Sequence, residues 1–381
     1  MNPYPIAITM IPGLGCHGTR QLLELFPNPE EVFSLSHAQL VEIFGTRNTI
    51  VKAIEEKTMF PRVEQEITFM KQHGINTLFC TDKAYPQRLN RPNCEDTPVL
   101  LYYLGNAAES GLESRWPTAC DLNNPRALSI VGSRRATDYG HTQTHHLIEE
   151  IRGENVLIVS GLAYGIDTAA HTAALQCQLP TVAVLGHGLD TLYPAQNKRL
   201  SKQILEGGGL LLTEYPSQTP VNPRYFPARN RIIAAMSDAT VVMEAAEKGG
   251  ALITANIANG YSREVFALPG RLGDAYSAGC NNLIACNKAY LLRSAGDLFF
   301  QLDWTAKKKK GGKSAKQTQI LTLLNEEQSV IANLLKTHGE LPLDEIVSLS
   351  AFTMSKTASL MLEMELSGVI RCLPGKIYKL V

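Results

Sequence analysis

The sequence predicts an α/β protein with a Rossmann-like, doubly wound and mostly parallel sheet, a small helical N-terminal domain and a C-terminal winged-helix domain. Three observations support this prediction. Short apolar runs recur through the middle of the chain, and a helix pattern follows each one. The runs do not alternate in polarity, as expected of strands that are buried on both faces of a parallel sheet. They lie at 127–131, 156–159, 181–185, 209–213 and 240–243.

The flanks of this central region have patterns of their own, so we expect three domains and a linker. The expected bounds are 1–65 for the helical domain, 66–302 for the Rossmann-like domain, 303–318 for the linker and 319–381 for the winged helix. A chain of 381 residues is long enough for this number of domains.

The overall charge excludes one way of binding nucleic acid. Lys and Arg total 36, and Asp and Glu also total 36. A chain without net charge has no general positive field, so any such binding must come from locally clustered cations.

The apolar runs are too short for a transmembrane helix, and the N-terminus lacks a signal-peptide pattern. We therefore expect a cytoplasmic protein without a membrane partner, and the eight scattered cysteines are expected to be reduced.

Residues 1–65 are expected to be helical. The turn Ile11-Pro12-Gly13-Leu14-Gly15 leads into a helix pattern over 19–26. An apolar–Gly–apolar–Gly turn resembles the turn of a helix-hairpin-helix element, whose amides can meet a DNA phosphate. It is also compatible with the ordinary packing of a small helical bundle. Beyond it, a helix over 67–73 with its C-cap at Gly74 and strands at 75–80 and 99–104 are expected to lead into the main sheet.

The loops after the central strands are rich in glycine and carry cations. Gly132-Ser133-Arg134 follows the first strand, and Thr137 is placed to cap the next helix. Ser160-Gly161 follows the second strand. Ligands bind at the carboxyl ends of parallel strands, where amides and helix N-termini are exposed. These loops therefore predict an anion site, most naturally for phosphate.

Other features argue against a cofactor or a catalytic centre. The first loop has one glycine where a dinucleotide site would have three, and no acidic residue follows the second strand in the ribose position. No cofactor is therefore expected. Asp167 and His171 share a helix face, but nothing nearby supplies a nucleophile or a metal, so a loop-fixing role is favoured. His141 and His145 are also four apart, yet no glutamate completes a metal motif. We expect neither catalytic residues nor a metal.

The segment from Phe226 to Arg231 opens another predicted helix. Arg229 and Arg231 are two residues apart, so their side chains diverge, and at most one is expected to line the same groove as Phe226. The other would brace a carboxylate or a neighbouring loop. Phe226 either stacks on a nucleobase or fills the core. Lys198, at the start of an earlier helix, is either a solvated lysine or part of the groove.

The C-terminal region has the element order of a winged helix. Helices are expected to begin after the cap Asn325, at Leu343 and at Met354, and a hairpin is expected over 369–380. The third helix carries little charge, so contact with a protein is at least as compatible with it as DNA readout. The Lys- and Gly-rich residues 307–316 indicate a flexible linker, with a nonspecific phosphate tether as the alternative.

The motifs of the central region, in this order and spacing, resemble those of the DNA-processing protein DprA/Smf family. They are VGSRRATDYG, SGLAYGIDTAAH, AVLGHGLDTLYPAQN, LLTEYP, FPARNRIIAAMSDATVVMEA, GGALITA and VFALPG. The match is close over residues 70–295 and looser on both flanks. The resemblance implies a protein that is not an enzyme. It would bind and protect incoming single-stranded DNA and load the RecA recombinase in natural transformation and recombination.

The resemblance also implies a binding site and partners. The DNA-binding residues would be Gly132, Ser133, Arg134, Gly161, Lys198, Phe226, Arg229, Asn230 and Arg231. Expected partners are RecA, the single-stranded DNA-binding protein and a second copy of the chain, which would join through the region Leu283–Leu292. Two positions depart from the family pattern. Gly249-Gly250 stands where Ser-Gly is usual, and Asn287-Lys288-Ala289 replaces a usual Gly-Ala in the expected dimer region.

Two other functions stay open. A nucleotide phosphoribohydrolase of the Lonely-guy type would bind a nucleotide phosphate at similar glycine loops, although its P-G-G-x-G-T-x-x-E motif is absent. An assembly adaptor would use its terminal domains to contact partners, and its DNA binding would be incidental. Binding of an unpaired oligonucleotide, compared with a duplex of equal length, distinguishes these functions.

Overall fold

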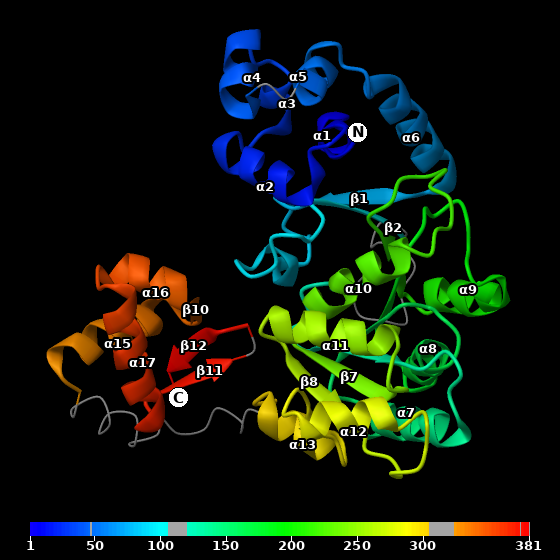
Figure 1. Ribbon diagram of the computed structural model, residues 1–381, viewed down its shortest axis with the longest axis vertical. Coiled ribbons are helices and arrows are strands. Elements are labelled where there is room, and N and C mark those ends of the chain that lie inside the picture. Colours follow the sequence, from blue (N-terminus) through cyan, green and yellow to red (C-terminus); the bar gives the residue numbers. More distant parts are fainter. Residues whose placement is uncertain (46–47, 106–119, 305–323, 374, 381) are drawn as a thin grey trace.

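The computed structural model describes residues 1–45, 48–105, 120–304, 324–373 and 375–380. The linker expected at 303–318 lies outside the described residues except for its first two positions. Figure 1 shows a helical unit at one end, a central α/β domain and a C-terminal unit beside it. No helix in the described ranges is long and apolar enough to cross a membrane.

The centre of the fold is one nine-stranded sheet with the order β1-β2-β6-β5-β4-β3-β7-β8-β9. From β6 to β9 neighbouring strands are parallel, whereas β1 and β2 add an antiparallel edge. The chain runs outward from β3 to β6 and then returns to place β7 beside β3. The sheet is therefore doubly wound, as predicted, with its switch point between β3 and β7. The strands are β1 (Asn76–Phe79), β2 (Leu100–Gly105), β3 (Ala127–Gly132), β4 (Leu157–Ser160), β5 (Thr181–Val184), β6 (Leu210–Thr213), β7 (Ala239–Glu244), β8 (Glu264–Ala267) and β9 (Tyr290–Leu291).

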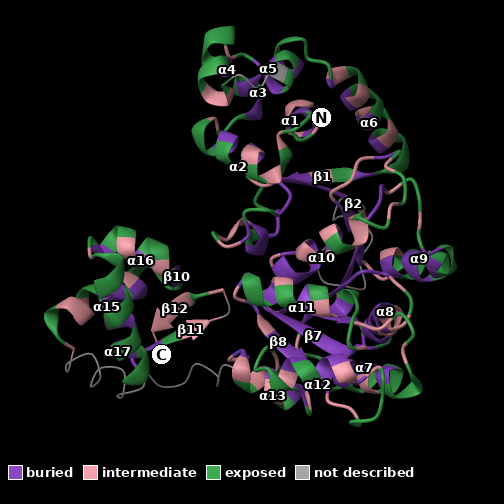
Figure 2. Cartoon of the chain, in the orientation of Figure 1, coloured by how far each residue is buried: buried purple, intermediate pink, exposed green. Residues whose placement is uncertain are grey.

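Helices cover both faces of this sheet, and the central strands are buried, as Figure 2 shows. Apolar residues of α7, α8 and α13 pack on one face. Those of α10, α11 and α12 pack on the other. Burial on both faces explains why the strands read as unbroken apolar runs. The helices are α7 (Asp138–Glu150), α8 (Ile166–Gln176), α9 (Lys198–Glu206), α10 (Tyr225–Ala235), α11 (Gly250–Gly260), α12 (Ala278–Ala285) and α13 (Ala295–Gln301), with short 3-10 turns η1 (Gln87–Asn90) and η2 (Ala195–Asn197).

The N-terminal unit is helical, as predicted, and shares its core with the first two strands. Gly13, in the turn between α1 and α2, has φ of 81°, and Gly15, the first residue of α2, has φ of 64°. Helix α6 begins at Phe60, earlier than the predicted start at residue 67, because Pro61 fits the first turn of a helix. The boundary expected at residue 65 therefore falls inside α6. The helices are α1 (Tyr4–Thr9), α2 (Gly15–Leu25), α3 (Pro29–Val32), α4 (His37–Phe44), α5 (Asn48–Glu55) and α6 (Phe60–His73).

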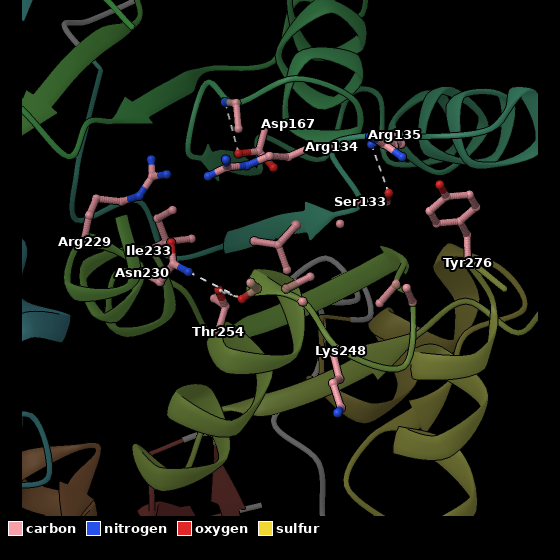
Figure 3. Close-up of a pocket in the computed structure, with 18 residues that line it drawn as sticks. Ser133, Arg134, Arg135, Asp167, Arg229, Asn230, Ile233, Lys248, Thr254 and Tyr276 are labelled. Carbon is pink, nitrogen blue, oxygen red and sulfur yellow. Dashed lines mark hydrogen bonds between the residues drawn. The ribbon is translucent and has the colours of Figure 1, made fainter. Parts of the chain in front are cut away.

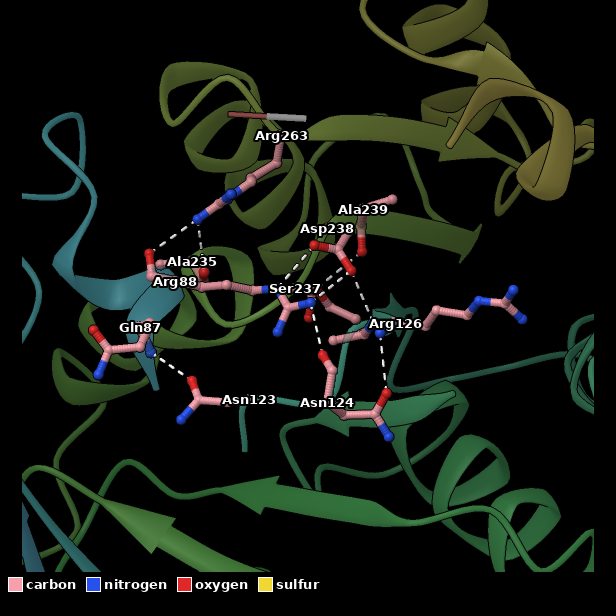
Figure 4. A network of polar contacts seen from close by, with 12 residues as sticks. Gln87, Arg88, Asn123, Asn124, Arg126, Ala235, Ser237, Asp238, Ala239 and Arg263 are labelled. Carbon is pink, nitrogen blue, oxygen red and sulfur yellow. Dashed lines mark hydrogen bonds and ion pairs between the residues drawn. The ribbon is translucent and has the colours of Figure 1, made fainter. Parts of the chain in front are cut away.

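A buried ion pair joins η1 to the amino-terminal edge of the parallel strands (Figure 4). Arg88 donates to both carboxylate oxygens of Asp238, at 2.8 and 2.9 Å. Asp238 also accepts the backbone N–H of Ala127 at 2.9 Å, where β3 begins. The guanidinium of Arg263 donates to the carbonyl of Arg88 at 2.9 Å. This network lies at the edge of the sheet opposite the carboxyl ends of the strands.

The C-terminal unit is a winged helix, as predicted. Asn325 caps α15 in a reciprocal capping box with Gln328. A two-residue strand, β10, was not predicted because so short a segment has no periodicity of its own. At the tip of the hairpin, the N–H of Gly375 donates to the carbonyl of Ser262 in the central domain at 2.7 Å. The elements are α15 (Glu326–His338), β10 (Leu341–Pro342), α16 (Leu343–Ser350), α17 (Met354–Leu366), β11 (Ile370–Leu373) and β12 (Ile377–Leu380).

Candidate nucleic-acid interface

A pocket of about 430 Å³ opens at the carboxyl ends of β3 and β7. We call it the switch-point pocket, since it lies where the two halves of the sheet meet. Its walls come from the loop after β3, the start of α8 with the turn before it, the middle of α10, and the loop after β7 with the start of α11 (Figure 3). The polar side chains of three of these segments are Ser133, Arg134, Arg135, Asp167, Arg229 and Asn230.

The loop after β3 is held by backbone contacts that leave its arginines free to reach solvent. The N–H of Ser133 donates to the carbonyl of Glu244 at 2.7 Å, and its hydroxyl accepts the N–H of Arg135 at 3.0 Å. Gly165 packs against this loop with φ of 73°. A Cβ at Gly165 would lie 2.1 Å from the carbonyl oxygen of Ser133, so this approach requires glycine. Arg134 and Arg135 are both exposed.

Arg229 places a fixed positive charge beneath the pocket. Its side chain lines the pocket although the residue is only 4% exposed. One Nη donates to the carbonyl of Gly161 at 2.7 Å and also to that of Val184, which braces the ends of β4 and β5. Its Nε has no hydrogen-bond partner. Burial lowers the pKa of Arg229 to about 10, against the opposing effect of Asp167, so the guanidinium stays charged at neutral pH.

Asp167 and His171 fix the structure around the pocket, in line with the favoured sequence interpretation. Asp167 accepts the N–H of Ala163 at 3.2 Å. Burial raises the pKa of this carboxyl, while Arg229 acts to lower it. His171 is fully buried against the hydroxyl of Thr181, and burial lowers the pKa of the imidazole to about 3, so it is neutral. Within the described parts of the chain, no three His, Cys, Asp or Glu side chains gather as a metal site.

Phe226 lies beside the exposed loop arginine rather than deep in the core. The guanidinium carbon of Arg134 lies 5.5 Å from the centre of the Phe226 ring. The centres of the Tyr193 and Phe226 rings lie 5.6 Å apart. Phe226 is half-buried, and Tyr193 is 44% exposed. An aromatic surface therefore adjoins the cationic loop, an arrangement suited to a phosphate next to a stacked base.

The structure does not bring every predicted site residue to this pocket. Arg231 points away from it and forms an ion pair with Glu214, as expected for one of two arginines that diverge on a helix. Lys198 is exposed at the start of α9 and is not among the residues that line the pocket. The DNA-binding roles of these two residues, like those of the other seven predicted site residues, stay predictions. Asn230 does line the pocket, and its side-chain amide donates to the carbonyl of Gly250 at 3.4 Å.

Four lining residues with polar side chains were not singled out from the sequence. They are Arg135, Lys248, Thr254 and Tyr276. Arg135 directly follows the predicted loop and could have been included with Arg134. Lys248 precedes the glycines that open α11, and Figure 3 shows its side chain pointing outward. Tyr276 belongs to the loop between β8 and α12, and no motif marks it.

Known proteins are similar to this chain in both sequence and fold. The family described as DNA recombination-mediator protein A matches residues 76–303, and the DprA winged helix domain matches residues 313–376. Protein Smf of Synechocystis is 31% identical over 407 residues, which cover 99% of this chain and 98% of that protein. The DNA processing protein DprA of Streptococcus pneumoniae is 37% identical over 287 residues, or 75% and 94% of the two chains. The X-ray structure of DprA from that organism matches with a TM-score of 0.65 and 34% identity, covering 79% of this chain and 98% of that one.

Proposed function

This chain belongs to the DNA recombination-mediator protein A family, also named DprA/Smf, and on that premise we propose that it binds single-stranded DNA at the switch-point pocket. Relatives named DNA processing protein support a role in DNA processing. The observation that carries the proposal is the pair of exposed arginines, Arg134 and Arg135, above the buried charge of Arg229. Together they place positive charge at the carboxyl ends of the parallel strands, where ligands bind in sheets of this kind.

The proposal favours an unpaired strand over a duplex for a physical reason. The cations suit phosphate oxygens, and the rings of Phe226 and Tyr193 suit the face of a base. Bases of a duplex are stacked on one another, so their faces are not available to side chains. Because the chain has no net charge, this local cluster has to supply most of the attraction.

A fluorescence-polarisation titration with labelled oligo-dT, compared with a duplex of equal length, tests this proposal. We expect tighter binding of the single strand. If three to five phosphates are neutralised, the slope of log affinity against log salt should be roughly −2 to −3.5, from about −0.7 for each phosphate of a single strand. Equal or tighter binding of the duplex, or an affinity that salt does not change, would contradict the proposal. Release of free base from a nucleoside monophosphate would instead indicate an enzyme.

We further propose a role in recombination that goes beyond binding. Through this site the protein would protect incoming single-stranded DNA in the cytoplasm and load RecA onto strands covered by the single-stranded DNA-binding protein. The family description as a recombination mediator supports this role. A RecA filament assay on covered single strands measures it. Filaments that form no faster when this protein is added would rule the loading role out.

We also propose that two copies associate through the edge of the sheet at β9. Tyr290 and Leu291 are 45% and 43% exposed, and an apolar edge strand favours pairing with another chain. Leu283 and Leu292, the ends of the expected region, are 6% and 1% exposed and pack in the core. Within the expected region Leu283–Leu292, the contact between the two copies would therefore be made by β9. Sedimentation should show a dimer that Leu291→Arg disrupts. A wild-type chain that stays monomeric at micromolar concentrations would exclude this.

A further inference from the structure

A second hollow, of about 880 Å³, adjoins the switch-point pocket. Its walls are the start of α7, the end of β7, and the loop between β8 and α12. Tyr276 lines both hollows and lies at one side of the pocket in Figure 3. A strand that leaves the first pocket past Tyr276 would enter this second hollow.

The two hollows differ in charge, so they suit different chemical groups of a ligand. Arg134, Arg135, Arg229 and Lys248 line the first pocket, with Asp167 as the one carboxylate. In the second hollow, Arg271 is the one cation among the lining residues, whereas three lining residues are acidic, Asp138, Asp274 and Glu244. Like charges repel, so the second hollow is unfavourable for a phosphate. It suits a neutral group that donates hydrogen bonds.

Two tyrosines give the second hollow flat apolar surface. Tyr139 is 46% exposed, and its hydroxyl donates to the carbonyl of Pro269 at 2.9 Å, which fixes the ring at the wall. Tyr276 is half-buried in the loop between β8 and α12. Every nucleobase has a face that can stack on such a ring.

We propose that the second hollow binds a nucleobase of the single strand whose phosphate occupies the switch-point pocket. This inference rests on the proposed function. Carboxylates accept hydrogen bonds from the amino group of cytosine. Thymine lacks an exocyclic amino group, and its carbonyl oxygens are acceptors that the carboxylates would repel. The subsite therefore favours cytosine over thymine and gives the site a modest base preference.

Polarisation titrations with oligo-dC and oligo-dT of equal length, at one salt concentration, test the inference. Wild-type protein should bind oligo-dC at least about threefold more tightly. Tyr276→Ala should weaken binding of both by about fivefold or more, since stacking of one base is lost. The double change Asp138→Asn and Asp274→Asn should abolish the preference for oligo-dC without weakening binding of oligo-dT. Leu272→Ala is the matched control, because Leu272 is 96% exposed in the same loop and does not line the hollow.

The outcomes separate this inference from the function on which it rests. Wild-type protein that binds neither oligonucleotide would refute the proposed function itself. Wild-type protein that binds both equally, with Tyr276→Ala unchanged in affinity and in thermal unfolding, would overturn the base subsite alone. If Tyr276→Ala lowers the unfolding temperature, the double Asp variant decides, because both aspartates are exposed. A preference for oligo-dC that survives in that variant would also overturn the inference.

Discussion

Replacing Asp238 with alanine is expected to lower the free energy of unfolding by about 3–5 kcal/mol. The change would leave the guanidinium of Arg88, a residue 8% exposed, buried without its counter-ion. The backbone N–H of Ala127 would also lose its acceptor at the start of β3. Removing one partner of a buried ion pair leaves the other charge buried without compensation. This costs far more stability than replacing both partners with apolar residues would.

Urea denaturation followed by circular dichroism measures this loss. The matched control is Glu206→Ala, which breaks the ion pair with Lys202 on the exposed side of α9. A pair of this kind, four residues apart on a helix, contributes about 0.3–0.5 kcal/mol. A loss of less than about 1 kcal/mol in Asp238→Ala would show that water or a neighbouring group compensates Arg88.

Arg134→Ala is expected to weaken binding of single-stranded DNA by about ten- to a hundredfold. A hydrogen bond to a charged group contributes about 1.5–3 kcal/mol, and one phosphate contact would be lost. The guanidinium also lies over the ring of Phe226, so its removal changes the surface offered to the neighbouring base. Arg134 is exposed, so the fold should not change.

The control is Arg152→Ala, which removes the same charge from an exposed position beyond the far end of α7. It should leave the affinity within about twofold, because at physiological salt exposed charges more than a Debye length apart are screened. Both variants are titrated with labelled oligo-dT after their unfolding temperatures are compared. A folded Arg134→Ala variant with wild-type affinity would remove Arg134 from the site.

Much of the fold could be predicted because local patterns carry it. The buried parallel strands appear as unbroken apolar runs between 127 and 243, and the helix caps Thr137 and Asn325 lie where their residue types place them. The divergence of Arg229 and Arg231 also follows from helix geometry alone, and Arg231 does face Glu214. These features depend on neighbours within one or two turns of the chain.

The sequence by itself determined the doubly wound class, the winged helix, the family and the first loop of the site, since each depends on local periodicity or ordered motifs. Only the tertiary structure decided which of two arginines lies beneath the pocket, and that Tyr276 reaches the site from a loop after β8. It alone pairs Arg88 with Asp238, 150 residues apart. The physical reason is that these contacts depend on how strands are ordered in the sheet, which periodicity along the chain does not encode.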